Sequence, residues 1–389
     1  MTQRLFGQKP GGSPTNRFTG GSPPPASPSG GANVTVTYEA KPGLGWLSVK
    51  NALLGLITLT IYRFWAKTNV RKHVWSCIHI NGEPLEYTGT GKELFIGALI
   101  ILFLIFLPFV LIVTGLQIAG YPGAAVIAQI VFGVLVILLF GMAIYRARRY
   151  RLSRTMWRGV RGSLGGSSVK YSLVYFGTYL LSAVTLGWSN PAMNLELQER
   201  ITKNMRFGET PFGFRGTAGP LYGRYAIAWF ASLVVMIVLT FAIGYGFSDY
   251  WAELFDNLRN AEKDPKALIS IVLAIYGAFF VLAIVFGIIW SFYTAFELAQ
   301  FARYTYFDNA TFRFNATAPS LIGLWLGNIL IIIFSLGIAA PFTVQRTIRY
   351  FVDRLDVDGW VDIGKIEQSR AAVSSHGEGL LDAFDIDGI

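Results

Sequence analysis

Four stretches of the sequence contain no charged residue and are long enough to cross a membrane: residues 94–116, 121–145, 225–247 and 267–296. A helix rises about 1.5 Å per residue, so about 20 residues cross a hydrocarbon core of about 30 Å. Charged residues make up 14% of the chain, compared with about 25% in typical soluble domains. These features predict a mainly α-helical membrane protein in which the four stretches form two transmembrane helical hairpins.

A repeated motif separates these stretches. Residues 58–91 align without gaps with a second copy 127 residues later, so that Thr58 corresponds to Thr185. In a third copy, a further 150 residues along the chain, Gly187 corresponds to Gly337. A period of this kind indicates one structural unit that recurs. We therefore predict tandem repeats over about residues 35–165, 166–316 and 317–366.

Three shorter apolar stretches, residues 51–62, 171–186 and 319–336, each precede a break in the pattern. The first has only 12 uncharged residues, too few to span alone. If all three crossed the membrane, basic clusters would lie on both faces, against the positive-inside tendency. We therefore predict broken or re-entrant helices that leave every copy of the motif on one basic face. Seven conventional spans are the alternative.

Basic residues interleaved with aromatic residues follow each break. Such segments suit the membrane interface, where aromatic rings anchor and cations meet anionic headgroups. The formal net charge of +10 lies in blocks between apolar stretches, which favours membrane topology over nucleic-acid binding. We predict a cytoplasmic basic face and no nucleic-acid partner. The candidate residues for contact with headgroups or other anions are Lys67, Arg71, Arg148, Arg149, Arg200, Lys203, Arg303 and Arg346.

Short β-hairpins are predicted after the basic segments. Asn81-Gly82 is a strong hairpin signal between two short strand patterns. An isolated hairpin is marginal in water, so we expect the hairpins and a strand at Tyr38 to form one small sheet on the cytoplasmic face. The counterparts of the first hairpin are residues 156–164, the weakest copy, and residues 205–214, 306–314 and 355–363.

The two ends of the chain differ from the membrane domain in composition. Residues 1–34 are rich in Gly, Pro and Ser and predict a disordered tail. This tail lacks the charged and apolar regions of a cleaved signal peptide. Residues 35–366 form the predicted polytopic domain, and residues 367–389 form a polar, then acidic, tail.

Recognisable catalytic patterns do not occur in the sequence. It contains no H-E-x-x-H, G-x-S-x-G or C-x-x-C, and its one cysteine and three histidines form no metal-ligand cluster. The Gly89-Thr90-Gly91-Lys92 run resembles a phosphate loop, but Glu93 follows where that motif requires Ser or Thr. We predict that the protein is not an enzyme and needs no cofactor.

Polar side chains that could line a pathway occur near the breaks, since the four long stretches contain no ionisable group. Broken helices with such groups form the substrate sites of many transporters. The alternative is that these amides bridge helices or cap the breaks. The candidate pathway residues are Asn51, Asn190, Asn194 and Asn328.

Several motifs resemble the YjgN-like family of bacterial inner-membrane proteins. They are YRFWAKTNVRKHVWSCIHINGEPLEYTGTGKELFIG, RARRYRLSRTMWRG, FGETPFGFRGTAG and WLGN with SLGIAAPFTVQRTIRYFVDRL. The resemblance covers about residues 36–366 and implies a multi-pass inner-membrane protein of unknown biochemical function, with no catalytic residues to carry over. The chain departs from it in the N-terminal tail and in the glycine-rich segment 159–166.

These observations lead to three functional hypotheses. The first is transport or permeation of a small solute, with a basic face that contacts headgroups. The second is a membrane scaffold or lipid-organising protein, and the third a lipid-modifying enzyme. The expected partners are membrane lipids with anionic headgroups, and homo-oligomers are a further expectation. Both termini are expected on the cytoplasmic side.

Overall fold

The computed structural model describes residues 32–241 and 265–366. Within them the protein is mainly helical, with four helices long and apolar enough to cross a membrane, as predicted. The predicted acidic loop at 248–266 and the two predicted tails lie largely outside the described residues. The four candidate spans are Gly91–Ile118 (α3 Gly91–Ile101, a π-helical turn Leu102–Phe106 and α4 Leu107–Ile118), α5 Pro122–Arg154, α8 Gly219–Phe241, and Ile275–Tyr304 within α10 Pro265–Tyr304.

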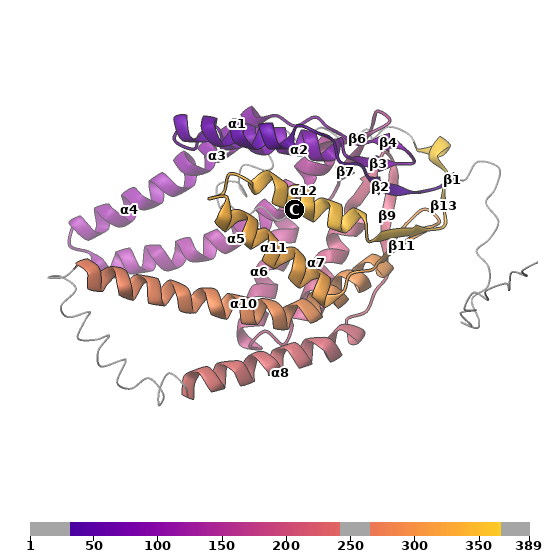
Figure 1. The fold of residues 1–389 in the computed structure, drawn as a ribbon. Helices are drawn as coiled ribbons and strands as arrows, with labels where there is room; N and C mark the ends of the chain where they lie inside the picture. Colours follow the sequence, from indigo (N-terminus) through magenta and orange to yellow (C-terminus); the bar gives the residue numbers. More distant parts are fainter. Residues whose placement is uncertain (1–31, 242–264, 367–389) are drawn as a thin grey trace, which may run out of the picture.

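Helix α5 is much longer than a membrane is thick. Its 33 residues extend about 50 Å at 1.5 Å per residue, compared with a hydrocarbon core of about 30 Å. The helix continues without a break through the basic segment that ends at Arg154. The charged end of α5 therefore projects beyond the hydrocarbon core. The long helices lie side by side in Figure 1, with the strands gathered at one end.

Three pairs of shorter helices each surround a break in the chain. At each break one hydroxyl organises the turn: those of Thr58, Thr185 and Ser335 donate to the carbonyl four residues earlier (2.7, 2.7 and 2.6 Å). Each also accepts from the backbone N–H four residues later (3.0, 3.2 and 3.1 Å). The same turn thus occurs three times. The pairs are α1 Leu44–Ile57 with α2 Arg63–Trp75, α6 Ser168–Val184 with α7 Asn190–Asn204, and α11 Ala318–Phe334 with α12 Ala340–Val352.

All strand pairs among the described residues are antiparallel, and most join successive short strands. The longest sheet has the order β12-β11-β10-β9-β8-β7-β6-β5, beside a sheet β2-β3-β4 and a pair β1-β13. The bounds are β1 Ala32–Asn33, β2 Val36–Tyr38, β3 Ile78–Ile80, β4 Glu83–Pro84, β5 Glu86–Tyr87, β6 Thr155–Trp157, β7 Val160–Leu164, β8 Met205–Phe207, β9 Thr210–Phe214, β10 Thr305–Phe307, β11 Ala310–Phe314, β12 Leu355–Asp358 and β13 Trp360–Val361.

These three sheets are parts of one ring. Strands β4 and β5 belong to one extended segment, which pairs with β3 at one end and with β6 at the other. Strands β1 and β2 likewise belong to one segment, which pairs with β13 and β3. Because β12 and β13 are also consecutive, the chain of pairings returns to its start. The strand ring is defined here as β1–β13 in this closed order.

Two sequence predictions differ from this arrangement. Residues 355–363 do not form a hairpin: β12 pairs with β11, and β13 pairs with β1. A single residue, Gly359, separates the two strands, whereas a tight hairpin needs about two loop residues. The second difference is at the N-terminus, where Ala32 and Asn33 fall in the predicted tail but form β1. Pairing with β13 brings these residues into the fold.

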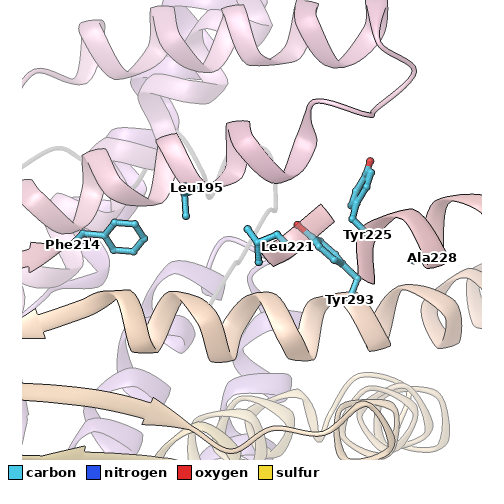
Figure 2. Packing of buried hydrophobic residues seen from close by; sticks show 6 residues of the cluster. All are labelled: Leu195, Phe214, Leu221, Tyr225, Ala228 and Tyr293. Carbon is cyan, nitrogen blue, oxygen red and sulfur yellow. The ribbon is translucent and has the colours of Figure 1, made fainter. Parts of the chain in front are cut away.

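The largest described core cluster joins the strand ring to the long helices. Tyr225 of α8 packs edge-on against Tyr293 of α10, with ring centroids 5.1 Å apart. Phe214, the last residue of β9, is 1% exposed in the same cluster. The cluster therefore fixes α7, α8 and α10 relative to the ring. Its members, shown in Figure 2, are Leu195, Phe214, Leu221, Tyr225, Ala228 and Tyr293.

Candidate anion-binding cleft

A cleft of about 370 Å³ lies where α1, α2 and α12 meet. We call it the α1–α2–α12 cleft. Lining residues come from α1, from the first break, from one face of α2 and from the break before α12. The cleft therefore lies beside two of the three helix breaks. Its volume is within the range of small-molecule sites, roughly 300–1,000 Å³.

Four cationic side chains line this cleft. Arg63, Lys67 and Arg71 are spaced by four residues on α2, which places them on one face of the helix. Arg151 joins them from α5. Among the described residues that line the cleft, none carries a carboxylate. Like charges at this spacing repel one another in a helix by about 0.2–0.5 kcal/mol per pair, so the cleft favours an anion that neutralises them.

Arg71 is the most buried of the four cations, with 9% of its surface exposed. A guanidinium nitrogen lies 3.5 Å from the Tyr87 hydroxyl, and the guanidinium carbon lies 6.0 Å from the centre of the Tyr87 ring. Tyr87 is the last residue of β5, so this contact joins α2 to the strand ring. The ring thereby helps to hold Arg71 at the wall of the cleft.

Uncharged polar groups from α1 also line the cleft. Ser48 and Asn51 are 3% and 7% exposed. The Ser48 hydroxyl and both amide atoms of Asn51 are buried and have no hydrogen-bond partner within the described part of the chain. A buried polar group without a partner costs about 1–3 kcal/mol. These groups are therefore suited to hydrogen-bond a polar ligand in the cleft.

Apolar side chains complete the wall. Val70 comes from α2, Pro341, Val344 and Ile348 come from α12, and Ile338 lies in the break before it. The same cleft thus presents cations, hydrogen-bonding groups and hydrocarbon surface. That combination matches an amphiphile with an anionic head and an apolar chain. Among the described residues, no group of three or more His, Cys, Asp and Glu is placed to hold a metal ion.

Of the eight predicted headgroup-contacting residues, Lys67 and Arg71 line the cleft. Arg149 donates instead to the carbonyls of Gly165 and Gly166, at 2.9 and 2.6 Å. Arg346 donates to the Gly323 carbonyl at 2.9 Å and to the Asn328 amide oxygen at 3.4 Å. Arg149 and Arg346 thus bind backbone or amide oxygens of their own chain.

The other four predicted cations lie elsewhere. Arg200 forms an ion pair with Glu196 at 2.6 Å, and Lys203 forms one with Glu199, both one turn apart on α7. Arg148 is half-buried on α5, and Arg303 is exposed near the end of α10. These positions spread the predicted basic face over several helices, and the structure brings only part of the predicted set together in the cleft.

The four predicted pathway asparagines have different surroundings. Asn51 lines the cleft. The Asn190 amide oxygen accepts a hydrogen bond from Ser182 at 2.7 Å. The Asn194 amide donates to Glu297 of α10 at 3.0 Å, and the Asn328 amide donates to Thr347 of α12 at 3.0 Å. The last three amides thus bridge helices or cap a break.

Sequence reasoning did not single out Ser48, Arg63 or Arg151 as site residues. Arg63 carried a usable signal, because it continues the four-residue spacing of Lys67 and Arg71. Arg151 is 80 residues from Arg71 in the chain and reaches the cleft only through the packing of α5. Ser48 belongs to the cleft because it lies one turn before Asn51 on α1.

Fold and site together define a multi-pass membrane protein with a basic cleft beside a ring of short strands. The model of a family described as "Bacterial protein of unknown function (DUF898)" matches residues 46–383. The chain belongs to this family. Curated relatives carry the name inner membrane protein YjgN. The protein from Salmonella typhimurium strain LT2 is 29% identical over 131 residues, 33% of this chain and 30% of that protein.

The protein from Escherichia coli strain K12 is also 29% identical, over 141 residues, which are 36% of this chain and 33% of the relative. The protein from Escherichia coli O157:H7 is 28% identical over 141 residues. The chain therefore spans about a third of the length of the curated relatives it matches. No solved structure matches the chain.

Proposed function

We propose that this integral inner-membrane protein binds anionic lipid headgroups on its cytoplasmic face and organises lipids there. The observation that carries the proposal is the α1–α2–α12 cleft, where Arg63, Lys67, Arg71 and Arg151 meet apolar side chains. A basic group near a membrane surface gains about 1 kcal/mol from anionic lipid. A cleft that also has an apolar wall holds the chain of a lipid next to its headgroup.

Placement of the helix breaks in the membrane is part of this proposal. Leu59, Leu186 and Leu336 lie at the tips of the three breaks and are 84%, 76% and 90% exposed. All three have left-handed backbone, with φ values of 47°, 51° and 50°. Three large apolar side chains at exposed tips are favourable in hydrocarbon and unfavourable in water. The broken helices therefore enter the membrane and return as re-entrant hairpins.

The lengths of the first helices of each pair agree with this placement. Helix α1 has 14 residues and extends about 21 Å, whereas α6 and α11 have 17 residues each and extend about 25 Å. All three are shorter than a hydrocarbon core of about 30 Å. In the re-entrant arrangement, the repeated basic segments and the strand ring share one side. The positive-inside tendency places that side, and both termini, in the cytoplasm.

Retention of anionic lipid by purified protein tests the lipid-binding proposal. Native mass spectrometry would count phosphatidylglycerol and phosphatidylcholine molecules bound to the full chain in mild detergent. We expect Lys67→Gln to weaken phosphatidylglycerol binding about fivefold, the equivalent of about 1 kcal/mol, with little effect on phosphatidylcholine. Lys72→Gln is the matched control, because Lys72 is exposed on α2 and does not line the cleft. Equal effects of the two substitutions would refute the proposal.

Permeation of a small anionic solute is the second candidate function. It is favoured by the position of Asn51, which is buried without a hydrogen-bond partner in the described chain and lies beside a helix break. Transporters often bind their substrates at such breaks. If the cleft belongs to a pathway, Asn51→Leu abolishes uptake of the solute into proteoliposomes. Unchanged uptake by this variant would exclude a pathway through the cleft.

A further inference from the structure

The strand ring encloses a second cavity, separate from the α1–α2–α12 cleft. Within residues 32–241 and 265–366 the thirteen strands form ten segments, because β1–β2, β4–β5 and β12–β13 are each one extended segment. Every segment pairs with a neighbour on both sides. A barrel of eight strands has an interior just wide enough for side chains or one small ligand, and the diameter grows with strand number. A ring of ten segments therefore leaves space inside.

Side chains alternate between the inside and the outside of this ring. On β11, Ala310 and Phe312 line the cavity, whereas Thr311 between them is exposed. On β12, Val357 lines the cavity and the preceding residue, Asp356, is exposed. This is the period of two expected for strands with one buried face. The interior of the ring is apolar and the exterior is polar.

The cavity inside the ring has a volume of about 320 Å³. Its side chains are apolar apart from Thr155 and Arg206. The Thr155 hydroxyl is engaged by Arg151 and Trp75, and Arg206 is exposed. Apolar cavities of this kind exclude water and accept apolar molecules. An ion or a sugar would lose its hydration there without replacement, so the lining selects a hydrocarbon.

One wall residue adds a hydrogen-bond donor. Trp157, the last residue of β6, is 5% exposed and lines the cavity. Its indole N–H is buried without a hydrogen-bond partner among the described residues. Buried indole N–H groups usually find a partner. An acyl chain with an acceptor oxygen at one end satisfies both the apolar lining and this donor.

The position of the ring gives acyl chains access to it. Strand β6 starts directly after α5, and β10 starts directly after α10. Both helices are candidate membrane spans that end in basic residues. Figure 1 shows the strands at this end of the long helices. The ring thus adjoins the end of the membrane region, where lipid acyl chains are abundant.

We infer that the interior of the strand ring binds one acyl chain, whose terminal carbonyl or carboxylate oxygen accepts a hydrogen bond from the Trp157 indole. The chain comes either from a free fatty acid or from a membrane lipid. This inference does not depend on headgroup binding in the α1–α2–α12 cleft, because the lining residues of the two cavities differ.

Photo-crosslinking tests the inference on the full chain in nanodiscs. The probes are a free fatty acid and a phosphatidylcholine, each with a diazirine near the end of an acyl chain, and labelled peptides are identified by mass spectrometry. We expect labels on β8–β11 from at least one probe. Labelling by the fatty acid alone identifies a free-acid site, and labelling by the phospholipid identifies a lipid site. Labels confined to α3, α4, α5, α8 and α10 with both probes would overturn the inference.

Substitutions on one strand provide a matched pair. Ala310→Leu adds volume inside the ring, and we expect it to lower labelling of the ring at least fivefold. Thr311→Leu changes the outer face of the same strand and should leave labelling unchanged. If Ala310→Leu does not yield a folded, monodisperse protein, Val357→Phe fills the cavity from β12. Equal labelling of the inner and outer variants would also overturn the inference.

Trp157→Phe tests the polar contact separately. The variant keeps an aromatic ring in the wall and removes the N–H donor. We expect labelling by the fatty-acid probe to fall about threefold or more, in keeping with about 1 kcal/mol for one hydrogen bond. A diazirine-bearing alkane, which has no acceptor oxygen, should label the variant and the original protein equally. A fall in both probes would show that Trp157 acts by shape and would remove the hydrogen bond from the inference.

Discussion

The Arg158 guanidinium donates two hydrogen bonds to the Glu83 carboxylate, with N–O distances of 2.7 and 2.8 Å. Glu83 starts β4, and Arg158 lies in the turn between β6 and β7. The two side chains therefore tie neighbouring parts of the strand ring together on its outer surface. Hydrogen bonds from Arg158, followed by its charge, lower the pKa of Glu83 below its usual range. The same contact raises the pKa of Arg158.

Replacement of Glu83 should therefore have a pH-dependent effect. A carboxylate whose pKa is lowered by folding stabilises the folded state above its unfolded pKa, about 4.3, and this contribution is lost as the pH falls through the lowered value. We expect Glu83→Gln to lower the melting temperature slightly at pH 7, since the pair is exposed. The difference from the original protein should vanish on acidification. A difference that persists well below pH 4 would contradict the assignment.

Asn51 and Asn328 should respond in opposite directions to the same substitution. Asn51 is buried without a hydrogen-bond partner among the described residues, so Asn51→Leu removes a desolvation cost of about 1–3 kcal/mol. The Asn328 amide donates to Thr347 and accepts from Arg346, so Asn328→Leu leaves polar partners unsatisfied. We expect the first variant to unfold at a higher temperature and the second at a lower temperature.

Thermal unfolding in one detergent, followed by tryptophan fluorescence, checks this pair. A change of about 1 kcal/mol corresponds to about 2–4 °C for a domain of about 200 residues. Each variant serves as the control for the other, because both replace an asparagine on an apolar helix. If both variants were destabilised equally, Asn51 would have a partner that the described contacts do not include.

The membrane spans and the first turn of the strand ring could be predicted from local sequence. Uncharged stretches of 23 to 30 residues admit few structures besides membrane helices. Asn81 and Gly82 both adopt positive φ, 50° and 81°. That is the geometry of the hairpin turn that Asn-Gly favours. In both cases neighbouring residues determine the structure without distant contacts.

Ring closure and the assembly of the cleft could not be predicted in the same way. Strand β1 has two residues, and its partner in β13 lies more than 300 residues later, as in the pair Ala32 and Val361. Such a short segment carries no periodic signal. Arg151 reaches the cleft only because α5 packs beside α2. Contacts of this kind depend on tertiary packing, which a local pattern does not encode.

Two glycines on α5 should differ in their tolerance of alanine. A Cβ atom added to Gly141 would lie 2.8 Å from the Cβ of Tyr175 on α6, whereas one added to Gly133 has no atom within 4 Å. The Tyr175 Cβ cannot move without its backbone, so Gly141→Ala should push α5 and α6 apart. We expect this variant to be destabilised by about 1–3 kcal/mol.

Gly133→Ala is the matched control on the same helix. Alanine is preferred to glycine in a helix interior by about 0.5–1 kcal/mol, so this variant should be neutral or slightly more stable. Thermal unfolding of the two variants in one detergent gives the comparison. Equal stability of both would show that α5 and α6 are not in close contact at Gly141.

Cysteine accessibility should show whether the broken helices re-enter or cross the membrane. The buried Cys77 is first replaced by alanine. Single cysteines then replace the exposed Lys72, Glu209 and Asn309, which follow three different apolar segments, while Ala119 lies between two spans. In the re-entrant arrangement the first three positions lie on one side of the membrane and Ala119 on the other. An impermeant maleimide applied to inside-out and right-side-out vesicles should therefore label the first three positions in one preparation and position 119 in the other. Seven conventional spans would instead place positions 72 and 209 on opposite sides, because the segment at 171–186 would then add a third crossing between them.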